Sequence, residues 1–176
     1  MLRIKNKIPK TAVELFEILP EGMRCQVIEN VLYMSPAPLF DHQEILMNIS
    51  SQLFLFTQKY KLGKTVVAPV DVYLDNKNAF QPDIIFIASN KLSIVKEGKV
   101  KGAPDLIVEV LSPGTANDDK GKKKKVYEAC GVKEYFIVDP VSGEVISLYG
   151  KNNKFEEGMP QKGKIVSRML KKTFKF

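Results

Sequence analysis

Two continuous apolar runs dominate the hydrophobic pattern of the chain. Each begins directly after a Pro-Asp pair: residues 84–87 (IIFI) follow Pro82-Asp83, and residues 106–111 (LIVEVL) follow Pro104-Asp105. An apolar run without polar alternation is typical of a strand that is buried on both faces. The pattern therefore predicts two neighbouring interior strands.

Apolar residues recur at helical spacing in three other segments. The longest extends from Asp41 to about Tyr60, and Gly63 shortly after it is a candidate C-cap. A second helix is predicted over residues 115–130. A short third helix is expected from Thr11 to Leu19.

Shorter β patterns fill much of the remaining chain. Residues 25–28 and 31–34 predict a hairpin that turns at Glu29-Asn30, because asparagine tolerates a positive φ. The order of strands, helix, strands, helix and strands predicts an α/β or α+β fold, in which helices flank a mixed central sheet. Further short strands are expected at residues 65–67, 70–74 and 133–138, and between residues 145 and 176.

The composition narrows the class of protein. The chain has 176 residues, of which 44% are hydrophobic and 27% charged, and this fits one globular domain over residues 1–176 rather than a disordered, collagenous or disulfide-scaffold protein. Cys25 and Cys130 are far apart and His42 is the only histidine, so a zinc site built on several such ligands is excluded. No apolar run reaches the roughly 18 residues of a membrane span. The first ten residues lack the apolar core of a secretory signal, so we expect a cytoplasmic protein.

Positive charge is concentrated in two places within a chain of net charge +7. Residues 151–176 are strongly basic, and a second cluster lies in the predicted helix 115–130. Such clusters attract phosphate backbones, although a solvated surface is the simpler explanation of either one alone. The nucleic-acid-binding candidates of the second cluster are Lys120, Lys122, Lys124 and Lys125.

Glu109 is the residue that most favours chemistry, because every neighbour in its strand is apolar. A buried carboxylate costs several kcal/mol unless a partner compensates it. A structural salt bridge would satisfy this requirement, and so would the role of metal ligand or general base. Asp83 is the second acid, at the start of the other apolar strand, and two such carboxylates are ligands that Mg²⁺ prefers. Asp105 also opens a strand, and spacing alone does not separate its role from that of Asp83.

The helix after Glu109 adds a cation. Thr115 and Asp118 form a start that resembles a capping box. At about 100° per residue, Lys123 falls near the centre of the apolar stripe of this helix, and Asp119 lies close to it. Lys123 could simply pair with Asp119 at the i, i+4 spacing. Together with Asp83 and Glu109, it forms the set of groups used in metal-assisted phosphodiester hydrolysis.

Several motifs resemble the Uma2 family (DUF820) of restriction endonuclease-like proteins, within the PD-(D/E)xK nuclease superfamily. The resemblance is most specific at residues 81–86 (QPDIIF) and 102–113 (GAPDLIVEVLSP). It continues in order through Asp119, Lys123 and Tyr127, residues 131–135 (GVKEY) and 138–140 (VDP), and it includes residues 34–36 (MSP) and His42-Gln43.

The resemblance implies a restriction-endonuclease-like α/β fold and a DNA endonuclease that uses Mg²⁺, or Mn²⁺ in its place, and acts as a homodimer. It implies Asp83, Glu109 and Lys123 as catalytic residues, with Val110 as a further metal ligand. The usual lysine two positions after Glu109 is replaced by Leu111, and the family pattern displaces it to Lys123. Secondary site candidates are Gln26, His42, Gln81, Asp119 and Tyr127.

One departure from the family pattern matters for function. The family's first strand usually reads YELIDG, whereas residues 25–30 read CQVIEN, so Gln26 stands where a further acid is expected. The site would lose one formal charge. The alternative to an active nuclease is therefore a nuclease-like module that binds nucleic acid or a protein partner without cleaving it.

Overall fold

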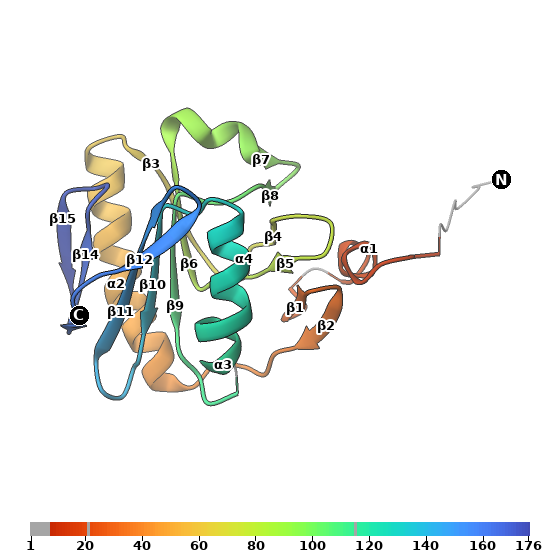
Figure 1. The fold of residues 1–176 in the computed structure, drawn as a ribbon, viewed down its shortest axis with the longest axis horizontal. Coiled ribbons are helices and arrows are strands. Elements are labelled where there is room, and N and C mark those ends of the chain that lie inside the picture. The colour runs from red at the N-terminus through yellow and green to blue at the C-terminus, as the bar shows by residue number, and fades with distance from the viewer. Residues whose placement is uncertain (1–7, 21, 115) are drawn as a thin grey trace.

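The computed structural model describes residues 8–20, 22–114 and 116–176. Its largest sheet has seven strands. Figure 1 shows these strands side by side through the middle of the molecule. In order across the sheet they are β12 (Lys154–Glu157), β11 (Glu144–Lys151), β10 (Glu134–Val138), β9 (Leu106–Val110), β6 (Ile84–Ala88) and β3 (Gly63–Val67), with β13 (Gln161–Lys162) paired to β11.

The two apolar runs form the neighbouring interior strands β6 and β9, as predicted. They are antiparallel, with Ile84 opposite Val108, while β9 runs parallel to β10. All residues of β9, and all of β6 except Ala88, are buried. Side chains alternate between the faces, so each face of the sheet carries its own apolar cluster.

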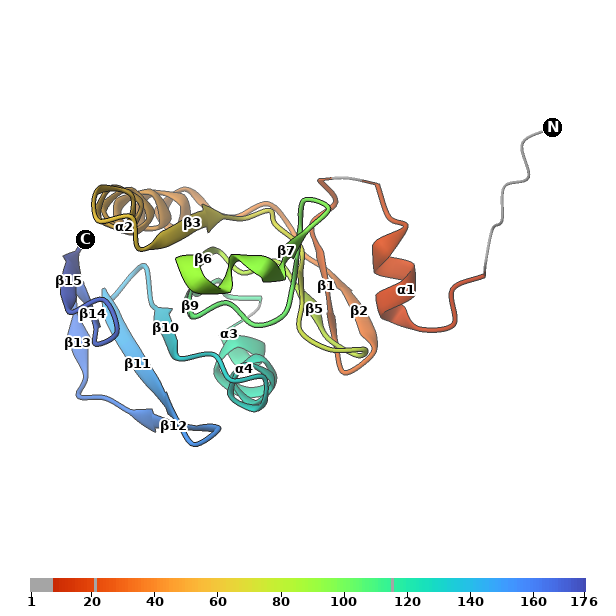
Figure 2. The same ribbon diagram turned by 90° about the horizontal axis from the view of Figure 1, so that it is seen from above.

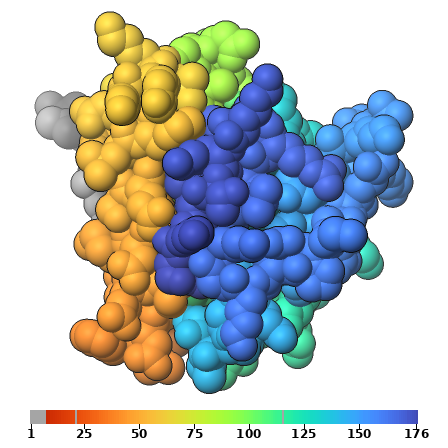
Figure 3. All heavy atoms as spheres, turned by 90° about the vertical axis from the view of Figure 1, so that its left-hand side faces the viewer, coloured from red at the N-terminus to blue at the C-terminus, as the bar shows by residue number. Residues whose placement is uncertain are grey.

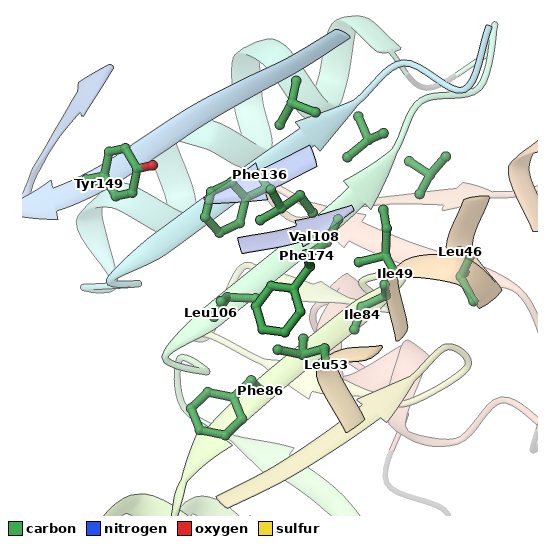
Figure 4. Packing of buried hydrophobic residues seen from close by; sticks show 14 residues of the cluster. Leu46, Ile49, Leu53, Ile84, Phe86, Leu106, Val108, Phe136, Tyr149 and Phe174 are labelled. Carbon is green, nitrogen blue, oxygen red and sulfur yellow. The ribbon is translucent and has the colours of Figure 1, made fainter. Parts of the chain in front are cut away.

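Helix α2 (Phe40–Lys59) covers one face of this sheet. Figure 4 shows Leu46, Ile49 and Leu53 of α2 directed at strand residues that include Ile84 and Val108. Burying each such side chain contributes roughly 1.5–3 kcal/mol relative to leaving it in water. This packing explains the helical spacing in the sequence.

The predicted C-cap of α2 is wrong. Helix α2 ends at Lys59, and Lys61 takes the left-handed conformation with φ 52°. Gly63 instead begins β3, where a Cβ atom would lie 2.0 Å from the carbonyl oxygen of Ile87. Glycine is needed there because β3 approaches β6 closely, not because the helix ends.

The opposite face is covered by the predicted helix 115–130, which is not one regular α-helix. It consists of α3 (Ala116–Asp118), a π-helical turn (Asp119–Lys123) and α4 (Lys124–Ala129). Thr115 lies outside the described residues. Figure 2 shows strands of the sheet lying between α2 and α4.

A second sheet of six strands lies to one side of the main sheet (Figure 2). The predicted mixed strands and flanking helices are present, but the sequence pattern did not indicate that the strands divide between two sheets. The predicted hairpin is present, and Glu29 and Asn30 have φ of 50° and 63° at its turn. The strand expected at residues 70–74 is only two residues long. The strands, in order, are β2 (Val31–Met34), β1 (Cys25–Ile28), β5 (Ala79–Phe80), β4 (Val72–Tyr73), β8 (Lys99–Lys101) and β7 (Val95–Lys96), with α1 (Ala12–Glu17) packed on the hairpin and a 3-10 helix, η1 (Ser89–Ile94), before β7.

The C-terminal segment forms a hairpin of β14 (Lys164–Ser167) and β15 (Lys172–Lys175) beside α2, as Figure 3 shows. Phe174 packs edge-on against Phe56 of α2. Buried Glu134 anchors the turn, since its Oε1 accepts the N–H groups of Arg168 and Met169 at 2.7 and 2.8 Å. Within the described residues, no helix is long and apolar enough to cross a membrane.

Candidate active site

A cavity of about 340 Å³ opens where the two sheets meet. One wall comes from β1 and the segment that follows β2. The other comes from the start of α2, the adjoining ends of β6 and β9, and the π-helical turn. Asp83, Glu109 and Lys123, the three catalytic candidates, all line this cavity.

Asp83 reaches the cavity because β6 begins immediately after it. It directly precedes Ile84, and Glu109 directly follows Val108, so the Ile84–Val108 register places both acids at the same end of two adjacent strands. Asp83 Oδ2 accepts a hydrogen bond from the N–H of Val110 at 2.8 Å. It also lies 3.2 Å from His42 Nε2. Burial alone would lower the pKa of His42, but the hydrogen bond and charge of Asp83 raise it above the usual range.

Glu109 is 3% exposed, and three donors hold its carboxylate. Its Oε1 accepts from Lys123 Nζ at 3.0 Å and from the Tyr127 hydroxyl at 2.8 Å. The main-chain N–H of Asp83 donates to Oε2 at 3.4 Å. Burial is the largest influence on this carboxyl and raises its pKa to about 7, against the opposing effect of Lys123. Asp119 and Asp83 raise the pKa further by charge repulsion. Glu109 therefore forms the salt bridge that a structural role predicts. It also lines the cavity, as the role of metal ligand or general base requires.

Lys123 is also buried, between two carboxylates. Its Nζ lies 3.0 Å from Glu109 Oε1 and 2.8 Å from Asp119 Oδ1. Burial alone would lower its pKa, but the two acids more than reverse this and raise it, so Lys123 stays charged. Asp119 and Lys123 are the two buried residues of the π-helical turn, so both lie on its inner face.

The two strand-opening aspartates have different surroundings. Asp105 lies at the other end of β9, where Lys133 Nζ is 2.8 Å from Oδ1 and the Ala88 N–H donates to Oδ2 at 2.9 Å. Burial would raise the pKa of Asp105, but these two contacts and Lys91 hold it below its usual value. Asp105 is therefore a structural acid, outside the cavity.

The two glutamine candidates both line the cavity. Gln26 is 6% exposed and lies in β1, the strand that forms the opposite wall. Gln81 donates its amide to the Met23 carbonyl at 3.1 Å and to Asp71 Oδ1 at 3.0 Å. Gln81 therefore links the segments that precede β1 and β4 in addition to lining the cavity.

The four lysines proposed for nucleic-acid binding have different surroundings. Lys122 Nζ bonds to the Tyr33 hydroxyl at 3.3 Å, and Lys120 lines a second cavity of about 300 Å³ that shares His42 with the first. Lys124 and Lys125 line neither cavity. All four are at least partly exposed, unlike Lys123.

Two residues at the site were missed from the sequence. Arg24 lines the cavity two positions before Gln26, and strand alternation gave a signal for it, since residues i and i+2 share a face. Tyr135 donates its hydroxyl to the Asp119 main-chain carbonyl at 3.0 Å, within the π-helical turn. No local sequence signal marks Tyr135, because it sits in an ordinary buried strand.

The donor set fits a hard cation that keeps much of its water. The carboxylate residues Asp83 and Glu109 line the same cavity, and Val110 lines it too. Mg²⁺ commonly binds through one or two carboxylates and several waters. Among the described residues, no three His, Cys, Asp or Glu side chains gather into a metal-holding group, so an all-protein cage is not what this site resembles.

Comparison with known proteins shows the family and the fold. Residues 13–161 match the Uma2 family model, described as "Putative restriction endonuclease". The chain belongs to the Uma2 family. A solved structure with the same fold is a "putative nuclease belonging to DUF820" from Anabaena variabilis, at a TM-score of 0.70 and 18% sequence identity, covering 85% of this chain and 84% of that one. No curated protein matches the sequence. Membership in Uma2 and the nuclease-like fold confirm the resemblance inferred from the motifs.

Proposed function

We propose that this Uma2 protein is a metal-dependent DNA endonuclease that hydrolyses phosphodiester bonds. The observation that carries the proposal is that Asp83 and Glu109 line one cavity, with the charged Lys123 held 3.0 Å from Glu109. Mg²⁺ is the proposed ion, with Mn²⁺ able to replace it, and Asp83, Glu109 and the Val110 carbonyl are the proposed ligands. When bound, the ion would activate water and neutralise charge that develops on the phosphate.

Hydrogen bonds from neighbouring residues fix the orientation of the two carboxylates. The Val110 N–H and His42 fix the carboxylate of Asp83, and Tyr127 fixes that of Glu109. Fixed acceptors lose little freedom when they bind, which favours binding. We assign Lys123 the role of stabilising negative charge on the transferring phosphate, a role that a charged donor fulfils best where water is excluded.

The alternative is a nuclease-like module that binds without cleaving. Gln26 favours it, because this buried side chain in the cavity wall carries no charge where the family has an acid. The retained Asp83, Glu109 and Lys123 favour the active enzyme.

We also propose that the protein acts on DNA in the cytoplasm as a homodimer. Residues 45–58 of α2 contain no charged side chain, although the whole chain carries +7. Met47 and Phe54 on this helix are 64% and 46% exposed, and Phe54 shares a shallow groove with Val66 and Val67 of the edge strand β3. Two copies of a basic protein repel each other least across such a neutral face.

Cleavage of supercoiled plasmid DNA tests the proposed activity. Wild type should nick the plasmid with Mg²⁺ or Mn²⁺ and not with EDTA, and Asp83→Asn should abolish nicking. Asp105→Asn is the matched control, because Asp105 also follows a proline and opens a strand but lies outside the cavity; it should lower the melting temperature and leave cleavage in place. Equal loss of cleavage from both variants would contradict the assignment of Asp83. DNA binding without cleavage under any divalent ion would establish the alternative.

A further inference from the structure

Arg24 is the cation of the cavity that the catalytic set does not use. It directly precedes β1, is half-buried, and lines the same cavity as Asp83 and Glu109. Its backbone is fixed by the hairpin, since the Arg24 carbonyl accepts from the Ser35 N–H at 2.9 Å. The side chain therefore belongs to the wall formed by the second sheet, whereas the two acids belong to the main sheet.

Arg24 has no acidic partner within the described part of the chain. The nearby carboxylate of Asp71 already accepts from Gln81 at 3.0 Å and lies 3.7 Å from Lys99. Lys123, the other cation of the cavity, is shared between Glu109 and Asp119. Arg24 thus presents the free positive charge of the cavity, and that charge reaches far enough to oppose protonation of His42.

A guanidinium is suited to one class of ligand above others. Its planar fork of N–H donors matches the two non-bridging oxygens of a phosphodiester and binds them in a bidentate manner. An unpaired arginine across a cavity from two carboxylates would also offset their repulsion of a polyanion. The alternative is that Arg24 only adds to the positive electrostatic potential of the surface. That role would not require a place in the cavity wall.

We infer that Arg24 binds the phosphodiester of the substrate, gripping its non-bridging oxygens from the wall opposite Asp83 and Glu109. This inference rests on the proposed nuclease function. It gives the second sheet a role in that function: the sheet supplies the substrate-holding side of the cavity, while the main sheet supplies the acids.

Binding of a fluorescein-labelled 20-base-pair duplex, measured by anisotropy in EDTA, tests the inference. Arg24→Gln should raise the Kd at least about tenfold and lower the slope of log Kd against log salt by about one, as expected for one lost phosphate contact. Arg24→Lys should fall between this variant and wild type, since it keeps the charge and loses the fork. Lys96→Gln is the control with the same change of charge at an exposed position of β7 that lines neither cavity, and it should change the Kd less than about threefold.

Two further measurements separate substrate binding from a structural role. In plasmid nicking with Mn²⁺, Arg24→Gln should raise KM more than it lowers kcat. Calorimetric titration with Mn²⁺ should give the wild-type affinity, because Arg24 is not a metal ligand. Loss of Mn²⁺ binding in Arg24→Gln, or a Kd no weaker than that of Lys96→Gln, would overturn the inference while leaving the nuclease function standing. A wild-type protein that neither bound nor cleaved DNA would overturn both.

Discussion

At the scale of single residues, the site is built around a buried charge that the fold must compensate. Lys123 is 4% exposed and yet ionised, because Glu109 and Asp119 lie on either side of it. Taking such ions out of water costs several kcal/mol each, and replacing them with apolar side chains often stabilises a protein. The arrangement is thus poorly explained by stability alone and well explained by chemistry at the cavity.

Lys123→Ala should abolish DNA cleavage, whereas Lys124→Ala should only weaken salt-sensitive binding. Lys123 contacts Glu109 inside the cavity wall, and Lys124 lies outside it. The structure adds a cost in stability: removing one member of a buried ion pair destabilises by roughly 3–5 kcal/mol, so Lys123→Ala should melt well below wild type. Plasmid nicking below the melting temperature of each variant checks this. Equal loss of activity in both variants would show that the lysine run acts as a general phosphate patch.

Gln26→Glu should tighten Mn²⁺ binding and raise cleavage. A carboxylate in the wall facing Asp83 and Glu109 would add a charged oxygen to the donor set, whereas the amide offers only a neutral one. The side chains are nearly isosteric, so the change in stability should be small. Calorimetric Mn²⁺ titration and plasmid nicking of both proteins measure the effect. Weaker Mn²⁺ binding in the variant would mean that Gln26 does not face the metal ligands.

Mn²⁺ affinity should rise with pH through about 7, because Glu109 must lose its proton to bind a cation and its pKa is about 7. The raised pKa of Glu109 also makes the stability of the folded protein depend on pH. The folded protein holds this proton more tightly than the unfolded chain, whose glutamates titrate near 4.5. The contribution of Glu109 to the free energy of unfolding is therefore full below about pH 4.5, and it is lost as the pH rises to about 7. Calorimetric Mn²⁺ titration from pH 5.5 to 8.5 on wild type and Glu109→Gln tests the predicted rise in affinity. An unchanged pH dependence in Glu109→Gln would assign the titration to another group.

At the scale of elements, the π-helical turn contains both Asp119 and Lys123, the buried ion pair of this helical segment. A regular α-helix gives each carbonyl an N–H partner four residues on, and a π turn disturbs this pattern. The Tyr135 hydroxyl supplies a donor to the Asp119 carbonyl at 3.0 Å, from β10 beneath the turn. Tyr135 is therefore a positioning residue for Lys123.

Tyr135→Phe should lower kcat for cleavage while leaving the fold intact. The lost hydrogen bond should cost about 1 kcal/mol, or somewhat more if the carbonyl stays unsatisfied. Tyr149→Phe is the matched control, since its buried hydroxyl also donates to a main-chain carbonyl, that of Val166 at 2.7 Å, far from the cavity. Both variants should lose similar stability by thermal melting, and only Tyr135→Phe should lose activity. Equal activity in the two variants would contradict the positioning role.

The elements that the sequence could predict are those with long regular patterns. The β6 and β9 runs, the spacing of α2 and the turn at Glu29-Asn30 each carry a local signal. Strands β4 and β5 have two residues each and show no periodicity, so the second sheet arises from pairing that only the tertiary fold provides. The π-helical turn has no local signal either, because residues 119–123 also fit the spacing of a regular α-helix.

The candidate site follows the same division. Glu109 and Lys123 were predicted because polar groups at apolar positions are informative. Asp83 and Asp105 were indistinguishable, since only the register of β6 with β9 shows that Asp83 adjoins Glu109 while Asp105 pairs with Lys133. Arg24 was missed because its relation to the acids depends on how the two sheets meet.

At the scale of the whole molecule, the cavity lies between two sheets of different character. The main sheet is covered on both faces and supplies the acids, while the smaller sheet supplies Gln26 and Arg24. Residues 45–58 of α2, together with Val66 and Val67 of β3, contain no charged side chain. In the proposed dimer, a second copy would pack on this face and leave the cavity open to the proposed DNA substrate.

Phe54→Asp should convert the protein from dimer to monomer, because it places a charge in the centre of the neutral face beside Val66 and Val67. Light scattering coupled to size-exclusion chromatography measures the mass directly, against 19.8 kDa for one chain. Ile18→Asp is a suitable control, since Ile18 is 65% exposed after α1 at the opposite side of the molecule. A wild-type monomer, or a dimer that survives Phe54→Asp, would contradict the proposed interface.

The central claim, that Asp83 and Glu109 hold the ion that serves catalysis, is tested most directly by a crystal soaked in Mn²⁺ and measured at the manganese absorption edge. One anomalous peak is expected in the cavity, about 2.0–2.6 Å from a carboxylate oxygen of each residue, as is usual for hard divalent cations. The peak should be absent from crystals of Asp83→Asn. An anomalous peak elsewhere, or none in the wild-type cavity at saturating Mn²⁺, would contradict the account.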